Sequence, residues 1–196
     1  SVTSILGAIP ERKQKIQAWR EAVGEKMANY ISASAVSRGK SLHTLIENHL
    51  KNEDSKSMGI TAIEPLGMFR IIQPYLNRID NIHGVEEYLY SDEIGVAGQC
   101  DCIAEYKGKL SIIDFKSSSK QRDEDYNYAN FLQTSAYAKM YEEIFPKYKI
   151  EQTVVLTSCA DGFVQEWIHG KEKFSAHQEL FYKHTKDFLD KMKINS

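Results

Sequence analysis

Two apolar segments in the middle of the chain, each carrying one aspartate, place the strongest constraint on its fold. The segments Gly98–Glu105 and Lys109–Phe115 are rich in Ile and Cys, and both read as strands. Lys107-Gly108 separates them and supplies a glycine for a tight turn. The sequence therefore predicts an antiparallel hairpin.

The register of this hairpin follows from the length of its turn. If Lys107-Gly108 is a two-residue turn, Tyr106 faces Lys109. Counting outward in step then brings Asp101 directly opposite Asp114. Residues paired in this way share one face, with their Cβ atoms roughly 4.5–5.5 Å apart. A longer loop would shift the register.

Two carboxylates placed opposite each other destabilise a hairpin, and a bound divalent cation removes the conflict. In the same register Lys116 faces Gln99 on the face that holds Asp114. An ammonium beside such an ion positions an attacking water or stabilises charge that develops on a phosphate. The pattern therefore predicts a metal-dependent active site that acts on phosphate esters. An exposed hairpin edge with scattered charges is the simpler alternative.

The rest of the chain predicts an α/β (α+β) arrangement of helices around a small sheet. Helices are expected over residues 11–30, 39–51, 66–80, 129–144 and 174–192, with a polar loop at 52–59. Ile16, Trp19, Val23 and Met27 form the apolar face of the first helix. Ser37 or Ser41 caps the second, and Pro74 begins, breaks or kinks the third. Further strands are expected over residues 84–90, 150–158 and 163–168.

Composition limits the classes of protein and the number of domains. With 196 residues we expect a single domain over residues 1–196, comprising a mainly helical part (1–80), a sheet core (84–170) and a C-terminal helix (174–194). The formal net charge of −2 counts against a module that grips DNA by charge alone. No stretch approaches the roughly 20 apolar residues of a membrane helix.

The three cysteines are too few and too unevenly placed for a disulfide framework or a four-cysteine metal site, which favours a reducing compartment. Cys100 and Cys102 flank Asp101. On a regular strand both would point to the face opposite that aspartate, as small buried core residues.

Four motifs, in order and spacing, resemble the PD-(D/E)XK nuclease superfamily, and within it the RecB-like exonuclease branch. The start Ser1–Leu6 and the run Asp101–Leu110 look especially like the mitochondrial genome maintenance exonucleases and their phage and bacterial relatives. The motifs are Arg38-Gly39-x-x-Leu42-His43, Gly98-x-x-Asp101, Asp114-Phe115-Lys116-Ser117 and Gln133-x-x-x-Tyr137.

The resemblance implies a restriction-endonuclease-like core and hydrolysis of DNA phosphodiester bonds, in DNA repair or replication. It assigns Asp101 and Asp114 as ligands of one or two Mg²⁺ or Mn²⁺ ions and Lys116 as the catalytic lysine. The carbonyl of Phe115 and the imidazole of His43 complete the metal site. Glu86 matches an acidic catalytic position of the family, although either Glu86 or its neighbour Glu87 faces the site, depending on register. Glu47, one turn after His43, orients that histidine or is a surface charge.

The same resemblance places a set of polar residues against the substrate, namely Arg38, Ser117, Lys120, Gln133 and Tyr137. Tyr137 is alternatively a core aromatic. The first helix carries cations beside Trp19 and Tyr30 that either guide a DNA strand or form a solvated face. The segment Gln121–Tyr128 mixes acidic residues, which repel DNA, with tyrosines, which stack on bases.

The expected activity is an exonuclease acting from the ends of single-stranded DNA. No iron–sulfur cysteines and no nucleotide-binding P-loop are present in the sequence, so neither a cluster nor ATP is expected. A helicase or replication and recombination proteins are expected partners, and a membrane is not. The expected location is the cytoplasm or nucleoid, or the mitochondrial matrix if a transit peptide precedes Ser1. A structure- or sequence-specific endonuclease and a non-catalytic DNA-binding module are the alternatives.

Overall fold

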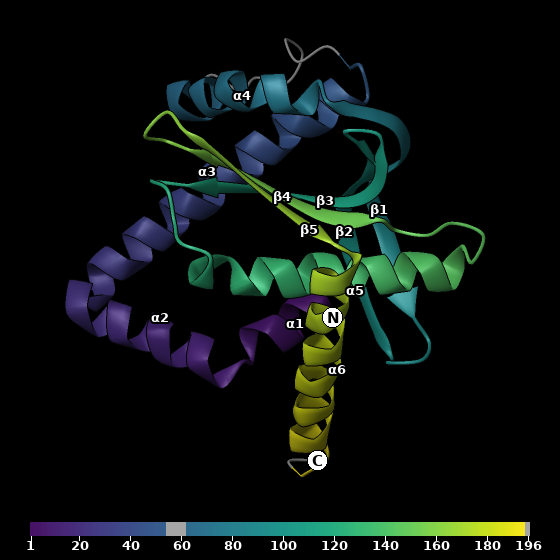
Figure 1. Ribbon diagram of the computed structural model, residues 1–196. Coiled ribbons are helices and arrows are strands. Elements are labelled where there is room, and N and C mark those ends of the chain that lie inside the picture. The colour runs from purple at the N-terminus through teal and green to yellow at the C-terminus, as the bar shows by residue number, and fades with distance from the viewer. Residues whose placement is uncertain (54–61, 195–196) are drawn as a thin grey trace.

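The computed structural model describes residues 1–53 and 62–194, and most of the loop expected at 52–59 lies outside them (Figure 1). The chain forms helices around one sheet, as predicted. The elements follow in the order α1 (Val2–Gly7), α2 (Pro10–Val23), α3 (Glu25–Leu50), α4 (Ile63–Leu76), β1 (Ile79–Ser91), β2 (Val96–Tyr106), β3 (Lys109–Ser118), the short 3-10 helix η2 (Asp125–Asn127), α5 (Tyr128–Ile144), β4 (Gln152–Cys159), β5 (Val164–Gly170) and α6 (Lys171–Ile194).

The five strands form one mixed sheet in the order β1-β2-β3-β4-β5. Consecutive strands pair antiparallel except β3 and β4, which are parallel and connected through α5. A parallel pair needs such a crossover, whereas a tight turn suffices for the others. The free edges of the sheet in the described residues are therefore β1 and β5.

Helices cover both faces of this sheet (Figure 1). One core lies between the sheet and α1, α5 and α6, and includes Val2, Leu132 and Phe181. The other lies between the sheet and α3 and α4, and includes Leu42 and Ile72. Both faces of β2 and β3 are consequently buried, which explains why these strands read as nearly continuous apolar runs.

The predicted hairpin and its register are confirmed. Tyr106 pairs with Lys109, and the ladder continues in step to Cys102 and Ile113. Lys107 and Gly108 both have positive φ, at 53° and 77°, as a two-residue hairpin turn of type I′ requires. The ladder between β2 and β3 ends at the pair of Cys102 and Ile113, so Lys116 does not pair with Gln99. Gln99 lies opposite Tyr88 of β1 instead.

The prediction of the N-terminal helices was wrong in its boundaries. The expected helix 11–30 breaks at Gly24, whose φ of 82° and ψ of 144° suit only glycine, and α3 then runs unbroken to Leu50. Ser37 and Ser41 therefore lie inside a helix and cap nothing. No residue of α2 is buried, so the apolar face expected there is exposed. Pattern alone does not tell an apolar face that meets a core from one that meets solvent.

Two further boundaries differ from expectation. The third helix begins at Ile63 and ends at Leu76, with Pro74 in its last turn, and β1 begins at Ile79 where the helix was expected to continue. Pro74 neither begins nor breaks α4, which extends two residues past it. The short helix α1 was not predicted, although its Val2 is fully buried. No helix among the described residues is long and apolar enough to cross a membrane.

The two cysteines around Asp101 are buried, as predicted, but they do not share a face. Cys100 belongs to the core under α5 and Cys102 to the core under α3 and α4. Their partners on β1 follow them, since Val85 lies opposite Cys102 and packs toward α3, whereas Glu87 lies opposite Cys100. The side chains of β1 and β2 therefore do not alternate strictly between the two faces of the sheet at the level of Glu86 and Asp101.

Candidate active site

Four elements bring the predicted catalytic side chains together at this irregular level of the sheet. His43 comes from α3, Glu86 from β1, Asp101 from β2, and Asp114 with Lys116 from β3. The one helix and three strands that hold them each contribute residues to a core. The site therefore stands on rigid elements rather than on loops.

Glu86, and not Glu87, faces the site. Its φ of 57° is unusual for a residue with a side chain, and the carbonyl of Glu86 accepts a hydrogen bond from Gln99 Nε2 at 3.0 Å. This backbone conformation turns two consecutive residues, Val85 and Glu86, toward α3. Glu87 instead lines a cavity on the other side of β1.

The side chains of His43, Glu86 and Asp101 offer three ligand atoms that lie within 4.8 Å of one another. His43 Nδ1 is 3.9 Å from Glu86 Oε1 and 3.7 Å from Asp101 Oδ2. Burial alone would lower the pKa of His43, but the carboxylates of Glu86 and Asp101 outweigh it, and the pKa lies above its usual value. The cluster thus attracts positive charge.

Asp101 also fixes its own position relative to β3. Its Oδ2 accepts a hydrogen bond of 2.8 Å from the backbone N–H of Phe115. This bond lies just beyond the last ladder pair of β2 and β3, at the level where the sequence places Asp114 opposite Asp101. A side chain therefore replaces the backbone acceptor at the point where the two strands part.

Asp114 and Lys116 form a second, more buried pair. Lys116 Nζ lies 2.6 Å from Asp114 Oδ1, while Asp114 Oδ2 is buried and has no hydrogen-bond partner among the described residues. Burial raises the pKa of Asp114 to about 6, against the opposing effect of the Lys116 charge. For Lys116, burial lowers the pKa, but Asp114 and Asp101 raise it above its usual value. Lys116 thus remains a cation beside the carboxylates.

These residues fit a divalent cation. Ligands on opposite sides of an octahedral Mg²⁺ are roughly 4.2 Å apart, twice its 2.0–2.1 Å bond, which is close to the spread of the three-residue cluster. The unpartnered Asp114 Oδ2 is an acceptor that a cation would satisfy. A mixed set of oxygen and imidazole ligands suits Mn²⁺ as well as Mg²⁺.

Two motif glycines explain how the helices approach the site so closely. A Cβ on Gly39 would lie 3.3 Å from Ser117 Oγ, so this glycine lets α3 pack against the end of β3. A Cβ on Gly98 would lie 2.7 Å from Tyr137 Oη and 3.1 Å from Val2 Cγ2. Gly98 therefore makes room for a buried tyrosine of α5.

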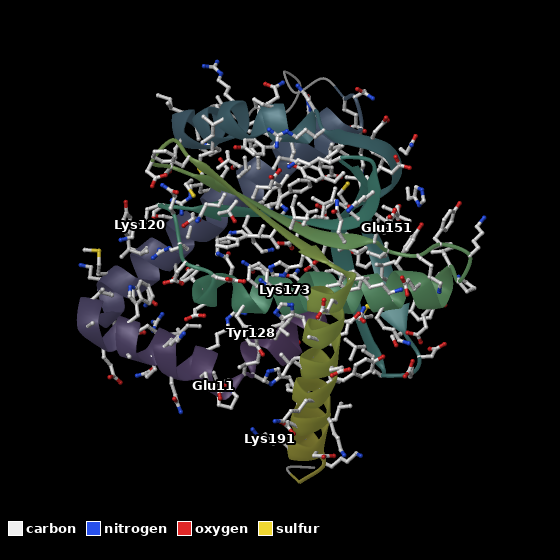
Figure 2. All side chains as sticks on the ribbon, viewed as in Figure 1. Glu11, Lys120, Tyr128, Glu151, Lys173 and Lys191 are labelled. Atoms are coloured by element: carbon white, nitrogen blue, oxygen red, sulfur yellow. The ribbon has the colours of Figure 1, made fainter. Side chains whose placement is uncertain are left out.

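The predicted substrate residues divide into two groups. Tyr137 is buried and hydrogen-bonded to Gln133, and its hydroxyl packs against Gly98 of β2. It therefore matches the alternative prediction of a core aromatic residue. Arg38 forms an ion pair of 3.3 Å with Glu64 of α4, and its Nε has no partner among the described residues. Lys120 is exposed at the far end of β3 (Figure 2). Contact of these residues with a substrate stays a prediction.

The acidic residues of Gln121–Tyr128 mostly serve the fold. Asp123 Oδ1 accepts a hydrogen bond of 2.8 Å from the N–H of Tyr126, at the start of η2. Glu124 forms an ion pair with Lys173 of α6. Tyr126 is exposed, and Arg122 Cζ lies over its ring, 4.6 Å from the ring centre.

Glu47, one turn after His43 on α3, pairs with Lys51 at 2.7 Å, as expected of a surface charge. It is not the partner of His43 in any described contact.

A cavity of about 550 Å³ lies away from these residues, between β1 and the end of α5. Its lining includes His83, Glu87, Tyr141 and Tyr148 and none of the predicted site residues. The predicted site residues instead cluster around His43 of α3.

Comparison with known proteins agrees with this arrangement. Residues 10–160 match the family described as the PD-(D/E)XK nuclease superfamily. The chain is 27% identical to mitochondrial genome maintenance exonuclease 1 of Mus musculus and 23% identical to that of Homo sapiens, each over 170 residues. These matches cover 83% of this chain but only 50% and 49% of the relatives, so the chain spans about half their length.

A likeness to a solved structure supports the fold alone. The crystal structure of a candidate exonuclease from Eubacterium rectale superposes with a TM-score of 0.54 at 8% identity. The match covers 78% of this chain and 66% of that one.

Proposed function

The chain belongs to the PD-(D/E)XK nuclease superfamily, and we propose on this basis that it is a metal-dependent exonuclease that hydrolyses single-stranded DNA from its ends. The observation that carries the proposal is the convergence of His43, Glu86 and Asp101 beside the Asp114–Lys116 pair. A metal-dependent nuclease needs ligands for a cation, a nearby ammonium and a rigid frame, and the residues that would supply them lie at this one level of the sheet.

The residues of the site would supply two functions, binding of the metal ion and stabilisation of charge on the phosphate. Mg²⁺ or Mn²⁺, held by His43, Glu86, Asp101 and Asp114 with the Phe115 carbonyl, would polarise a phosphate oxygen and lower the pKa of a bound water. Asp101 keeps its orientation through the Phe115 N–H. Lys116, held by Asp114, places its ammonium where negative charge grows on the phosphate during attack.

A helical arm beside the site suits a flexible single strand. α2 and the first half of α3 project from the body (Figure 1). The start of α2 returns to the start of α5, where Glu11 lies within electrostatic range of Tyr128 (Figure 2). Arg12 on the same turn lies within range of Lys116.

The exposed side chains of this arm combine cations with aromatic rings. Trp19 is 36% exposed and Tyr30 is 70% exposed, although neither contributes to a core. Stacking on rings together with cations along a backbone is how single-stranded nucleic acids are bound without sequence preference. The exposed cations of the arm are Arg12, Lys13, Lys15 and Lys26. Arg20 is half-buried and pairs with Glu25.

We propose that hydrolysis needs no ATP, because the sequence contains no P-loop motif. An enzyme without a motor acts on ends that are already single-stranded, or on those that a partner helicase exposes. Such a role fits DNA repair or replication.

The test is digestion of single-stranded oligonucleotides labelled at either end, with Mg²⁺ or Mn²⁺ and without ATP, with each end blocked in turn. We expect that blocking both ends stops hydrolysis and that closed circular single strands survive. Cleavage of the circle would establish an endonuclease instead. Binding without hydrolysis in either metal would establish a non-catalytic module. Lys116→Ala serves as the background that assigns any hydrolysis to this site.

A further inference from the structure

Beyond the catalytic cluster, the segment 119–124 between β3 and η2 holds an arginine in a fixed place. One side chain of β5 binds the backbone of Arg122 at two points. Gln165 Oε1 accepts from the Arg122 N–H at 2.8 Å, and Gln165 Nε2 donates to the Arg122 carbonyl at 2.7 Å. The guanidinium Nε in turn donates a long hydrogen bond of 3.4 Å to Ser118 Oγ. Backbone and side chain of Arg122 are therefore both anchored to the sheet.

Ser118 places this arginine beside the proposed catalytic lysine. β3 pairs with β4 without a register shift from Ser111 to Ser118, so its side chains alternate and Lys116 and Ser118 share one face. Phe115, on the other face, packs into the core under α3 and α4. Residues two apart on a strand are roughly 6.6 Å apart. The guanidinium of Arg122 is thus anchored one such step beyond Lys116, on the same side of β3.

The positive charge of Arg122 is not neutralised within residues 1–53 and 62–194. No acidic side chain there forms an ion pair with it, and its two Nη groups have no acceptor. Three nearby carboxylates are bound to other groups, those of Asp123 to the Tyr126 N–H, of Glu124 to Lys173 and of Asp161 to the Gln121 N–H. The N–H bonds at the outer edge of the guanidinium are therefore available to an anion.

The ring of Tyr126 covers one face of this guanidinium. Arg122 Cζ lies 4.6 Å from the ring centre, and Tyr126 itself is 61% exposed. Stacking occupies the face of the guanidinium plane and leaves the donors in the plane free. Such a fixed fork of donors matches two oxygens of a phosphate better than a mobile ammonium does.

We propose that Arg122 binds a backbone phosphate of the single strand next to the phosphate that lies at Lys116, and that Tyr126 positions its guanidinium. The inference rests on the proposed function and deepens it, because it names a contact with the strand outside the point of cleavage. Lys120, in the same segment, is exposed and adds a second positive charge (Figure 2). A contact with the phosphate rather than with a base fixes the strand without reading its sequence.

The experiment measures equilibrium binding of a fluorescent oligothymidylate to the full chain carrying Lys116→Ala, in Mg²⁺ and over a range of NaCl concentrations. A set of oligonucleotides, each with one uncharged methylphosphonate linkage at a different position, is measured in parallel. The variants are Arg122→Gln, Tyr126→Phe and Tyr126→Ala. Lys147→Gln is the matched control, since it removes another cation that lies over a tyrosine ring, 4.8 Å from the centre of Tyr148. Thermal unfolding of every variant is recorded alongside.

We expect Arg122→Gln to weaken binding by about tenfold, as loss of one charge-assisted contact implies. The slope of log affinity against log salt should fall by about 0.7, the value for one phosphate of a single strand. One methylphosphonate linkage that weakens binding to the background should no longer do so in Arg122→Gln, because the two changes remove the same contact. Lys147→Gln should stay within about twofold of the background.

Unchanged affinity and salt slope in Arg122→Gln would overturn the inference. So would a loss of affinity in which every neutral linkage still weakens the variant as it weakens the background. Tyr126→Phe should bind within about twofold of the background and Tyr126→Ala about threefold more weakly, since the ring acts through Arg122. A loss for Tyr126→Ala larger than that for Arg122→Gln would overturn the positioning role.

This binding comparison is separate from the test of the proposed nuclease. If the unaltered chain hydrolyses no oligonucleotide, the proposed function fails, while the salt slope and the neutral linkages still decide whether Arg122 binds a phosphate. If hydrolysis proceeds and Arg122→Gln binds every strand as the background does, the phosphate contact alone fails.

Discussion

Asp101 of β2 accepts a hydrogen bond from the backbone N–H of Phe115 in β3, with 2.8 Å between Oδ2 and the nitrogen. The bond joins the two strands just past the end of their ladder. Phe115 lies between Asp114 and Lys116, so this contact fixes Asp101 against the segment that carries these two proposed catalytic residues. A structural bond and a proposed metal ligand are thus the same carboxylate.

This double role predicts different outcomes for two substitutions of Asp101. Asp101→Asn keeps an oxygen that accepts from the Phe115 N–H, so its unfolding free energy in a metal chelator should stay near that of the unaltered chain. Asp101→Leu leaves a buried N–H without an acceptor and should lose about 1–3 kcal/mol. Denaturant unfolding measures both. Both should lose hydrolysis, and equal stability of the two variants would contradict the structural role.

Glu86, and not Glu87, should support metal binding. Mn²⁺ at 100 times its dissociation constant raises the unfolding free energy by about 2.7 kcal/mol, and a tenfold weaker site gives about 1.4 kcal/mol less. We expect Glu86→Gln to lose at least that much of the Mn²⁺-dependent increase. Glu87→Gln is the matched control, since its side chain lies on the opposite side of β1. The assignment is wrong if Glu87→Gln shows the larger loss.

Lys116 should be essential for turnover rather than for folding. Loss of one preorganised charge at a developing anion lowers rates by about 10²–10³-fold. We therefore expect Lys116→Ala to reduce hydrolysis of labelled single-stranded DNA by at least that factor. Lys109→Ala removes an exposed lysine from the start of the same strand and should retain full activity. Comparable rates for the two variants would remove Lys116 from the mechanism.

Gly98 should tolerate no side chain. A Cβ there would lie 2.7 Å from Tyr137 Oη, so Gly98→Ala should cost about 1–3 kcal/mol of unfolding free energy through overpacking. Tyr137→Phe removes the hydroxyl and should restore part of this loss in the double variant. Gly67→Ala in α4 meets nothing within 4 Å and should instead be neutral or stabilise by up to about 1 kcal/mol. A neutral Gly98→Ala would show that α5 moves freely against β2.

His169 should make stability depend on pH. Burial, with smaller effects from the nearby charges of Lys173 and His177, lowers its pKa to about 4, although Glu124 opposes this. In the unfolded chain the imidazole of His169 is protonated near pH 6.5, whereas in the folded chain it stays neutral until the pH is lower. The contribution is therefore fully present above pH 6.5 and is lost as pH falls from 6.5 toward 4.

The size of this effect should be on the order of 1–3 kcal/mol. Unfolding free energies of the unaltered chain and of His169→Gln, measured from pH 7 to pH 4, test it. The variant should show the shallower decline below pH 6.5. Parallel profiles would mean that His169 is protonated equally in both states.

Much of the site could be read from short-range pattern. Lys107-Gly108 defines a tight turn between two apolar segments, and the register of the two strands follows by counting, so the levels of Asp101 and Asp114 were predictable. Lys116 beside Asp114 follows from a spacing of two on a strand. These inferences hold because hydrogen bonding within a hairpin is local and regular.

Other features depended on contacts between distant segments. Whether Glu86 or Glu87 faces α3 depends on a left-handed residue that interrupts alternation, and no periodic pattern signals it. The break at Gly24, the unbroken α3 and the exposure of α2 likewise depend on which apolar faces meet a core.

The sequence by itself therefore determined the hairpin, its register, the mixed layers of helix and strand, and the residue types of the candidate site. Only the tertiary structure decided that Glu86, rather than Glu87, joins His43 and Asp101. The reason is physical. Local sequence sets backbone conformation over a few residues, whereas the side on which a carboxylate finally lies is set by packing across the sheet.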